Sequence, residues 1–310
     1  MIVSTAAMRA IAESHPGIEL DVLASPANAS VLDGASYVRQ VIVFDRRDAR
    51  SYLAAARRLR GERYDAVIDC MVTAPSVTTL LLMLATDAPY RVGIAGREND
   101  VAINVSVDPP TGEQLMAIRL GALSGAFGVD PLTRDWRPEL VVSPTLREAA
   151  AARWRSFATG TPGGQRVLVN VSAGAPARQW QVEKYAAAIE HIRARLPDAI
   201  VFVTGAPSER DRIDAAAAMS GATGVVTPSL SEAFALVATA DFVLTPETSI
   251  VHAASAFRRP AVALYRHQES LRWGLHPEFG ENVENSESTL VTLEVGPVLA
   301  AIDRVLARRG

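Results

Sequence analysis

Short runs of β-branched and other apolar residues alternate with longer alanine-rich segments along the chain. Apolar runs bounded by polar turn residues predict strands. In the first half, the predicted strands are residues 19–23, 41–44, 66–69 and a segment near 101–107. In the second half, they are residues 167–171, 200–204, 242–245 and 261–265. Strands that alternate with helices favour parallel sheets that are covered on both faces.

Helical periodicity marks the segments between these strands. The predicted helices are residues 2–13, 50–60, 146–157, 182–196, 231–240, 249–257 and 295–308. Leu53, Ala56 and Leu59 share one helical face, which we expect to be buried. Ser229 and Glu232 have the spacing of a capping box, so they should open the helix that follows them.

The pattern changes after Asp130, where prolines interrupt a polar stretch. A turn-rich segment at 159–165 predicts a linker. At roughly 150 residues per domain, a chain of 310 residues suggests two domains. We predict doubly wound α/β domains on either side of this linker, at residues 1–158 and 166–290. Ligands of such sheets bind beyond the carboxyl ends of the strands, which here would face a cleft between the domains.

Composition and charge exclude several classes of protein. The formal charge of −3 excludes a generally basic nucleic-acid-binding protein. A single cysteine excludes a disulfide framework and a cysteine-based zinc site. No apolar run approaches the 18 or so residues of a membrane-spanning helix, and the first residues lack the pattern of a secretion signal. A cytoplasmic enzyme is the expectation that remains.

The first candidate loop, SAGAPARQW, directly follows the predicted strand 167–171. Its small residues, among them Ser172 and Gly174, would let a ligand approach the backbone closely. Arg178 could supply a guanidinium group for a phosphate. The alternative is an ordinary strand-to-helix loop with a surface arginine.

The second candidate loop is TPETSIVH, which follows the predicted strand 242–245. Thr248 or Ser249 is a plausible N-cap, and the free N–H groups of a helix start favour an anion such as a diphosphate. Thr248 and His252 are four residues apart and lie on one helical face. A carboxylate would repel phosphate, so we expect Glu247 to accept hydrogen bonds from sugar hydroxyls. The alternative is a capped helix in which His252 is a buried structural histidine.

Weaker candidates follow other strands. Thr204 ends the predicted strand 200–204, and Gly205 and Glu209 follow it, although Glu209 could equally be a helix-start carboxylate. Asp69, at the end of the strand 66–69, could line the cleft. No set of His, Asp or Glu has metal-ligand spacing, and the common nucleophile, P-loop and dinucleotide motifs are absent from the sequence.

Six segments in order carry a family resemblance. RRLRGERYDAVID and YRVGIAGR lie in the first half, after a stretch beginning IVSTAAMRAIAESHPGIELDVL. SAGAPARQWQVEKYAAAI, VFVTGAPSE and LTPETSIVHAASAFRRPAVALY lie in the second half. Over nearly its whole length the chain resembles glycosyltransferase family 9, the heptosyltransferases of lipopolysaccharide core assembly. The last segment is the most specific.

The resemblance implies a GT-B fold, with two Rossmann-like domains and a cleft between them. It implies an acceptor-side domain at 1–158, a donor-binding domain at 166–290 and a final segment, 291–310, whose helix packs back on the first domain. It also implies an inverting enzyme that needs no metal ion or cofactor. The donor substrate would be a nucleotide diphosphate-sugar, usually ADP-heptose. The acceptor would be a glycan or glycolipid at the inner face of the cytoplasmic membrane.

Carried over by position, Arg178 matches a basic residue that contacts the donor phosphate. Glu247, Thr248 and Ser249 match the family's Asp-Thr/Ser-Gly, and His252 matches the histidine that follows. This chain has glutamate where the family has aspartate, and serine where the family has glycine. Each change narrows the pocket by about one methylene group, and a size difference of that kind discriminates between ligands by about 1–3 kcal/mol. These changes could therefore retune the donor sugar without abolishing binding.

The family's first strand and its Gly-Asp loop would precede the helix that begins at Ile2. That aspartate is the family's presumed general base and would lie before Met1, so no catalytic base is assignable. Either Met1 is not the natural start, or the chain is a catalytically silent sugar-nucleotide-binding homologue. A sugar-nucleotide epimerase is a third alternative. On the acceptor side the candidates are Arg91, Arg97 and Asp69, of which the arginines could equally be solvated surface residues.

Overall fold

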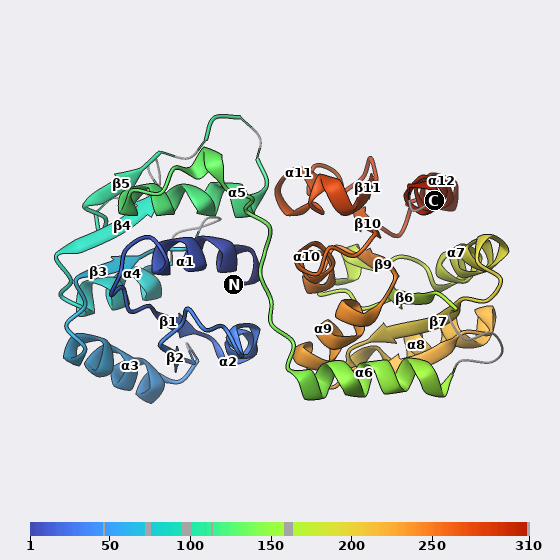
Figure 1. Ribbon diagram of the computed structural model, residues 1–310, viewed down its shortest axis with the longest axis horizontal. Coiled ribbons are helices and arrows are strands. Elements are labelled where there is room, and N and C mark those ends of the chain that lie inside the picture. Colours follow the sequence, from blue (N-terminus) through green and yellow to red (C-terminus); the bar gives the residue numbers. More distant parts are fainter. Residues whose placement is uncertain are drawn as a thin grey trace. The chain divides into compact units, whose positions relative to one another are not determined.

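The computed structural model describes residues 1–45, 47–71, 76–94, 101–108, 110–112, 114–157 and 164–308. The chain forms two compact units, Met1–Val141 and Val142–Gly310 (Figure 1). The boundary predicted at residue 158 is therefore wrong, because the helix that precedes it belongs to the second unit. Most of the predicted linker at 159–165 lies outside the described residues.

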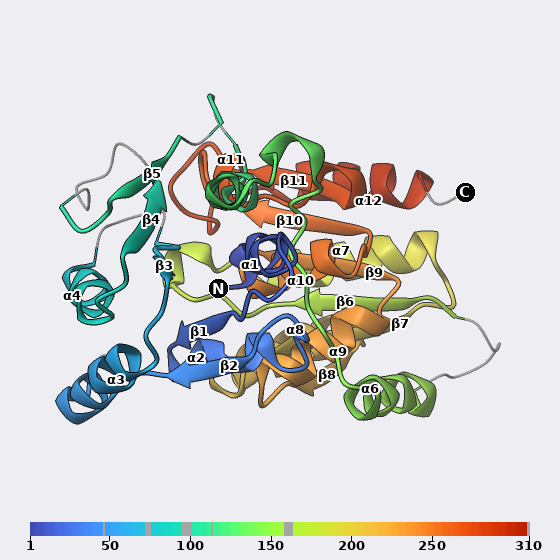
Figure 2. The same cartoon turned by 60° about the vertical axis from the view of Figure 1, so that its left-hand side comes forward.

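The second unit is built on a six-stranded parallel sheet with the order β11-β10-β9-β6-β7-β8 (Figure 2). Its strands are β6 (Arg166–Asn170), β7 (Ile200–Gly205), β8 (Thr223–Val226), β9 (Phe242–Pro246), β10 (Ala261–Tyr265) and β11 (Gly280–Glu284). From β6 the chain winds outward through β7 to β8, and from β9 it winds the other way to β11. This is the order of a doubly wound dinucleotide-binding sheet, and its direction reverses between β6 and β9.

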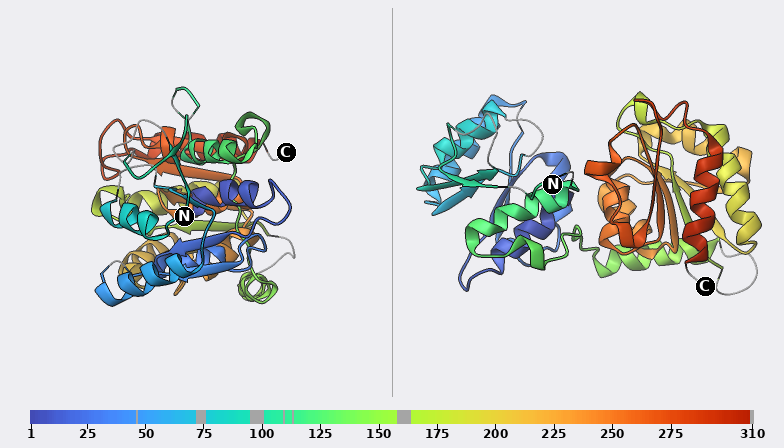
Figure 3. Two further views of the ribbon diagram at one scale, coloured as in Figure 1. Left: turned by 90° about the vertical axis from the view of Figure 1, so that its left-hand side faces the viewer. Right: turned by 90° about the horizontal axis from the view of Figure 1, so that it is seen from above.

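Helices cover both faces of this sheet (Figure 3). They are α6 (Pro144–Ser156), α7 (Val182–Arg195), α8 (Arg210–Ser220), α9 (Leu230–Thr239), α10 (Ser249–Ala256), α11 (Ser270–Trp273) and α12 (Val295–Ala307), with short 3₁₀ turns η5 (Pro176–Arg178), η6 (Pro207–Glu209) and η7 (Pro277–Phe279). Because both faces are covered, the central strands are apolar at nearly every position. Val167, Leu168 and Val169 of β6 are fully buried.

Helix α6 packs on α9 of the second unit. Its buried residues are Ala150 and Trp154. The indole Nε1 of Trp154 donates a hydrogen bond to Thr239 Oγ1 at 3.0 Å. This buried face attaches the helix to the second unit, although nothing in its local pattern identifies that partner.

The final helix, α12, also belongs to the second unit. Val298, Ala301, Ile302 and Val305 lie in the same buried cluster as Ile189 of α7, and α12 packs on α7, β10 and β11. The expectation that the segment 291–310 packs back on the first domain is therefore wrong. The apolar face of α12 packs on the sheet and on α7 of its own unit.

The strands of the first unit are parallel and form two separate sheets. One sheet pairs β1 (Asp21–Ala24) with β2 (Gln40–Val43), and the other has the order β3 (Ala66–Ile68), β4 (Tyr90–Ile94) and β5 (Val105–Val107). The helices are α1 (Thr5–Ala12), α2 (Pro26–Ala29), α3 (Ala49–Gly61), α4 (Val77–Ala85) and α5 (Met116–Gly121), with 3₁₀ turns η1 (Ile2–Ser4), η2 (Ser30–Leu32), η3 (Ala122–Phe127) and η4 (Pro131–Thr133).

Helix α3 buries a different face from the one predicted. Ala55 and Leu59 are buried, Ala56 is partly buried, and Leu53 is 53% exposed. The buried face follows Tyr52, Ala55 and Leu59, at spacings of three and four residues, and packs with Leu82 of α4. Leu53 therefore points away from the core. Among the described residues, no helix is long and apolar enough to cross a bilayer.

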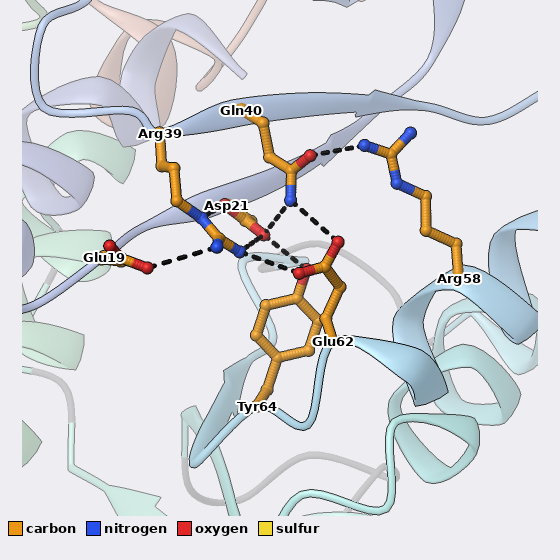
Figure 4. Close-up of polar contacts among 7 residues, drawn as sticks. All are labelled: Glu19, Asp21, Arg39, Gln40, Arg58, Glu62 and Tyr64. Carbon is orange, nitrogen blue, oxygen red and sulfur yellow. Dashed lines mark hydrogen bonds and ion pairs between the residues drawn. The ribbon is translucent and has the colours of Figure 1, made fainter.

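A polar network joins the start of β1 to β2 and to the chain after α3 (Figure 4). Asp21 accepts hydrogen bonds from Arg39 Nε at 2.7 Å, from Gln40 Nε2 at 2.6 Å and from the Tyr64 hydroxyl at 2.6 Å. Glu62 contacts both Arg39 and Gln40 at 3.2 Å. Burial alone would raise the pKa of Asp21, but the hydrogen bonds from Arg39, Tyr64 and Gln40 outweigh it and hold this pKa below its ordinary value.

Candidate functional site

A cavity of about 530 Å³ lies at the carboxyl ends of the strands in the second unit. Its walls come from the loops after β6, β7, β8 and β9, so it spans the point where the strand order reverses. The lining includes Ser172, Gly174, Arg178, Thr204, Gly205, Glu209, Glu247, Thr248 and Ser249, all predicted from the sequence. Residues from separate loops thus meet at the edge where doubly wound sheets bind ligands.

The cavity combines a guanidinium group with a helix N-terminus. Arg178 lies in η5, and its Nη2 is 3.2 Å from Oε1 of the buried Glu247. Thr248 is the N-cap of α10, and its hydroxyl oxygen accepts the N–H of Ile250 at 3.3 Å. The helix dipole and the remaining N–H groups of the first turn favour an anion at this point.

Asn170, the last residue of β6, fixes two of these loops. Its Nδ2 donates hydrogen bonds to Thr245 Oγ1 at 3.0 Å and to Thr248 Oγ1 at 3.1 Å. Its Oδ1 accepts the N–H of Ser172 at 3.1 Å. The amide is buried, so both of its ends are committed to positioning the loop after β6 and the cap of α10.

Ser172 and Gly205 bring the loops after β6 and β7 together. The Ser172 hydroxyl accepts the N–H of Ala206 at 2.8 Å. A Cβ on Gly205 would lie 2.8 Å from this hydroxyl oxygen, so a side chain there would displace it. A Cβ on Gly174 would meet nothing within 4 Å. Thr204 donates its hydroxyl to the Val225 carbonyl at 2.8 Å, which gives it a structural bond inside the sheet.

The loop after β7 contributes a second carboxylate, Glu209, to the cavity lining. Glu209 ends η6, and its Oε2 is 3.6 Å from Arg212 Nε. Arg212 also donates to the Trp180 carbonyl at 2.7 Å. The predicted cap of α9 is confirmed, since Ser229 Oγ accepts the N–H of Glu232 at 3.2 Å. Ser229 itself lines the cavity.

The other predicted site residues lie elsewhere. His252 is not among the cavity-lining residues, and its ring packs edge to face on Trp273 with centroids 6.3 Å apart. Burial lowers the pKa of His252 to about 4, so its imidazole is neutral near pH 7. The roles of the cavity residues and of His252 toward a ligand stay predictions.

The acceptor-side candidates belong to the first unit. Arg91 donates from Nε to the Ala102 carbonyl at 2.6 Å and from Nη1 to the Ala88 carbonyl at 3.1 Å, so its guanidinium holds backbone segments together. Asp69 is buried and accepts the N–H of Met71 at 2.9 Å. Arg97 lies outside the described residues. The acceptor roles of all three stay predictions.

Sequence reasoning missed two residues of this site. Asn170 lies inside the predicted strand 167–171, and nothing in the sequence indicates that its amide organises the loops. Arg266 directly follows β10, and its Nη2 is 3.7 Å from Glu247 Oε2. Arg266 could have been found by searching the residue after every predicted strand. No group of three or more His, Cys, Asp or Glu side chains in the described part of the chain could hold a metal ion.

A family model provides the decisive comparison. The model of glycosyltransferase family 9 (heptosyltransferase) matches residues 52–294, which is most of the chain. The chain belongs to glycosyltransferase family 9. The family match makes this protein a glycosyltransferase, and it confirms the resemblance drawn from the sequence motifs. No curated protein sequence matches this family 9 chain significantly.

Solved structures share the fold of this family 9 chain. A glycosyl transferase family 9 protein of Veillonella parvula superposes with a TM-score of 0.83 at 15% identity, over 99% of this chain and 93% of that one. The Escherichia coli heptosyltransferase WaaC with ADP gives a TM-score of 0.76 at 18% identity, over 98% and 95% of the two chains. The E. coli ADP-heptose lipopolysaccharide heptosyltransferase II gives 0.73 at 19% identity, over 100% and 96%. These similarities confirm the GT-B fold.

Proposed function

We propose that this protein transfers a sugar, most simply heptose, from an ADP-sugar to a lipopolysaccharide-core or similar glycan acceptor. The observation that carries the proposal is the meeting of Arg178 with the N-terminus of α10 in one cavity. A guanidinium group and a helix start together form a diphosphate site. The similar E. coli structures with ADP and with an ADP-heptose analogue support adenosine diphosphate as the donor nucleotide.

The proposed reaction is an in-line displacement that inverts the anomeric centre. The acceptor hydroxyl oxygen forms a bond to the anomeric carbon as the bond to the diphosphate breaks, and the hydroxyl proton is released, so the products are the glycosylated acceptor, ADP and a proton. Arg178 and the N–H groups at the start of α10 stabilise the charge that develops on the leaving diphosphate. Because these positive groups offset the negative charge of the diphosphate, the proposed reaction needs no metal ion or cofactor. Glu247 would accept hydrogen bonds from the sugar.

Calorimetry with ADP tests the donor site. Losing one charge-assisted hydrogen bond to phosphate costs about 1.5–3 kcal/mol, so Arg178→Ala should weaken ADP binding roughly 10- to 150-fold. Arg147→Ala, an exposed arginine of the same unit, is the matched control and should bind ADP like the wild type. Unchanged ADP affinity in Arg178→Ala, or binding that requires added Mg²⁺, would contradict the proposal.

We also propose that the enzyme works in the cytoplasm at a membrane surface, where it meets a glycolipid acceptor. The support is an exposed face of the first unit, the α3–α4 face. Helix α4 has no charged residue and exposes Val77 (72%), Leu81 (51%) and Leu84 (50%), spaced along one helical face. Its neighbour α3 has four arginines and no acidic residue, with Arg50 and Arg57 exposed. Apolar residues beside cationic ones match an anionic lipid surface.

Vesicle sedimentation tests the α3–α4 face. Vesicles containing an anionic phospholipid should bind the wild type, and vesicles of zwitterionic lipid should bind it more weakly. The double variant Leu81→Asp with Leu84→Asp should lose most of the binding. Leu132→Asp is the control, because Leu132 is 85% exposed and lies in η4, outside this face. Equal binding by both variants would contradict the assignment.

A further inference from the structure

Glu247 lies between two guanidinium groups at the edge of the cavity. Its Oε1 is 3.2 Å from Nη2 of Arg178, and its Oε2 is 3.7 Å from Nη2 of Arg266. The three residues come from different places: Arg178 from η5, Glu247 from the end of β9, and Arg266 from the end of β10. Glu247 thus connects Arg178, which lines the cavity, to Arg266, which was not among the site residues predicted from the sequence.

The two arginines are engaged unequally. Arg266 also pairs with Glu269, at 3.0 Å, and its side chain is 21% exposed. Arg178 is 35% exposed and lines the cavity. Among the described residues, no donor lies within hydrogen-bond distance of Glu247 Oε2, which is buried. Arg178 is therefore the cation that an incoming anion can reach, and Arg266 is the one that stays behind Glu247.

We infer that Glu247 is the internal counter-ion of Arg178 before a donor binds, and that Arg266 is a positioning residue that holds Glu247 once the donor diphosphate engages Arg178. This inference rests on the proposed donor site. A diphosphate offers a guanidinium group more charge and more acceptor oxygens than one carboxylate does. When Arg178 turns to the diphosphate, Glu247 Oε1 loses its partner and becomes free to accept a hydroxyl of the sugar.

Arg266 is needed for this exchange because a buried carboxylate is costly without a cation. Burial raises the pKa of Glu247, Arg178 opposes this shift, Glu269 adds to it, and Arg266 opposes it. Tyr265 also adjoins the group, and burial together with the Glu247 charge raises the pKa of its hydroxyl. Once Arg178 is engaged by phosphate, Arg266 is the remaining arginine that keeps Glu247 ionised and aligned.

The test compares ADP with ADP-heptose in Arg266→Gln. ADP lacks the sugar, so its affinity should stay within about twofold of the wild type, whereas ADP-heptose should bind about tenfold more weakly. Arg272→Gln removes the same charge from an exposed position of α11 and should bind both ligands normally. Equal losses for ADP and ADP-heptose would show a merely structural role and overturn the inference.

The pH dependence gives a second readout. Arg266 favours the ionised form of Glu247, so removing it raises the pKa of this carboxyl further. The acid limb of ADP-heptose binding should therefore move to higher pH in Arg266→Gln, and Arg266→Lys should move it back toward the wild type. A variant that merely weakens the fold would not move this midpoint. An unmoved midpoint would overturn the inference, and thermal melting of both variants checks that they are folded.

A double-mutant cycle tests the counter-ion role. Glu247→Gln should bind ADP several-fold more tightly than the wild type, because Arg178 is no longer occupied. In an Arg178→Ala background this gain should disappear. A gain that persists would mean simple repulsion between Glu247 and phosphate and would overturn the counter-ion role. Wild-type protein that binds neither ADP nor ADP-heptose would refute the proposed donor site itself, and this inference with it.

Discussion

Trp154 of α6 is stacked on Phe202 of β7, with ring centroids 3.9 Å apart and planes 8° from parallel. Both side chains are fully buried. Phe157 meets the same ring edge to face at 5.5 Å. The stack places α6 against the sheet that carries the cavity, so this helix is part of the structure that supports the proposed donor site.

Trp154→Ala should lower the free energy of unfolding by about 3–5 kcal/mol, the usual cost of deleting a large buried aromatic side chain. The variant also leaves Thr239 without its indole donor. Urea denaturation measures the change. Arg153→Ala, the exposed neighbour on α6, should stay within about 0.5 kcal/mol of the wild type. A similarly small loss for Trp154→Ala would mean that α6 is only loosely attached.

Gly205→Ala should destabilise the protein by about 1–3 kcal/mol, because the added methyl group overpacks a filled space. It would push on the Ser172 hydroxyl and on Ile213 and should break the bond from Ala206 N–H to Ser172. Gly174→Ala is the matched control, since its methyl group would enter open space. Thermal melting of the pair measures the difference, and equal melting temperatures would refute the close approach of the two loops.

Asn170→Ala should cost about 1–3 kcal/mol of stability, because it leaves the partly buried N–H of Ser172 without its acceptor. The hydroxyls of Thr245 and Thr248 would also lose a donor, which loosens the cap of α10. We therefore expect weaker ADP binding as well, measured by calorimetry. A destabilised variant that binds ADP with normal affinity would show that the Asn170 hydrogen bonds stabilise the fold but are not needed for ADP binding.

Asp21→Asn should destabilise the first unit at neutral pH and have little effect in acid. The pKa of Asp21 is below its ordinary value in the folded protein, so its ionised form adds stability above the unfolded-state pKa of about 4. This contribution is lost as the pH falls through the folded-state pKa. Urea denaturation at pH 7 and near pH 3 should show the gap between wild type and variant closing. Asp33→Asn, an exposed position, is the control.

The buried strands of the second unit were predictable because burial on both faces makes them apolar throughout. β10 begins and ends at its predicted residues, and β6, β7 and β9 differ by one residue at one or both ends. The strands β4, β8 and β11 were not predicted from the sequence. β11 reads GENVE, and only Val283 is buried, so an edge strand of this kind has no apolar run to reveal it. β8 contains Gly224, and β4 contains both Arg91 and Gly93.

Most of the candidate site followed from one rule, that loops after parallel strands meet at one edge. The rule placed Arg178, Thr248 and Glu209 around a common cavity without any tertiary information. It could not show that the Thr204 hydroxyl donates a hydrogen bond to the Val225 carbonyl. Nor could it show that β6 ends in Asn170, whose amide organises two loops. The partners of α6 and α12 were also beyond it, because an apolar stripe reveals that a helix is buried and not what covers it.

The central position of β6 has a consequence for local opening of the sheet. Its backbone is bonded to β7 on one side and to β9 on the other, whereas β8 and β11 each have one neighbour. Fraying begins at edges, so amide hydrogens of β6 should exchange with solvent more slowly than those of β8 or β11. Asn170 is the last residue of this doubly flanked strand. We therefore expect the part of the cavity lining that Asn170 contributes to be ordered before any ligand binds.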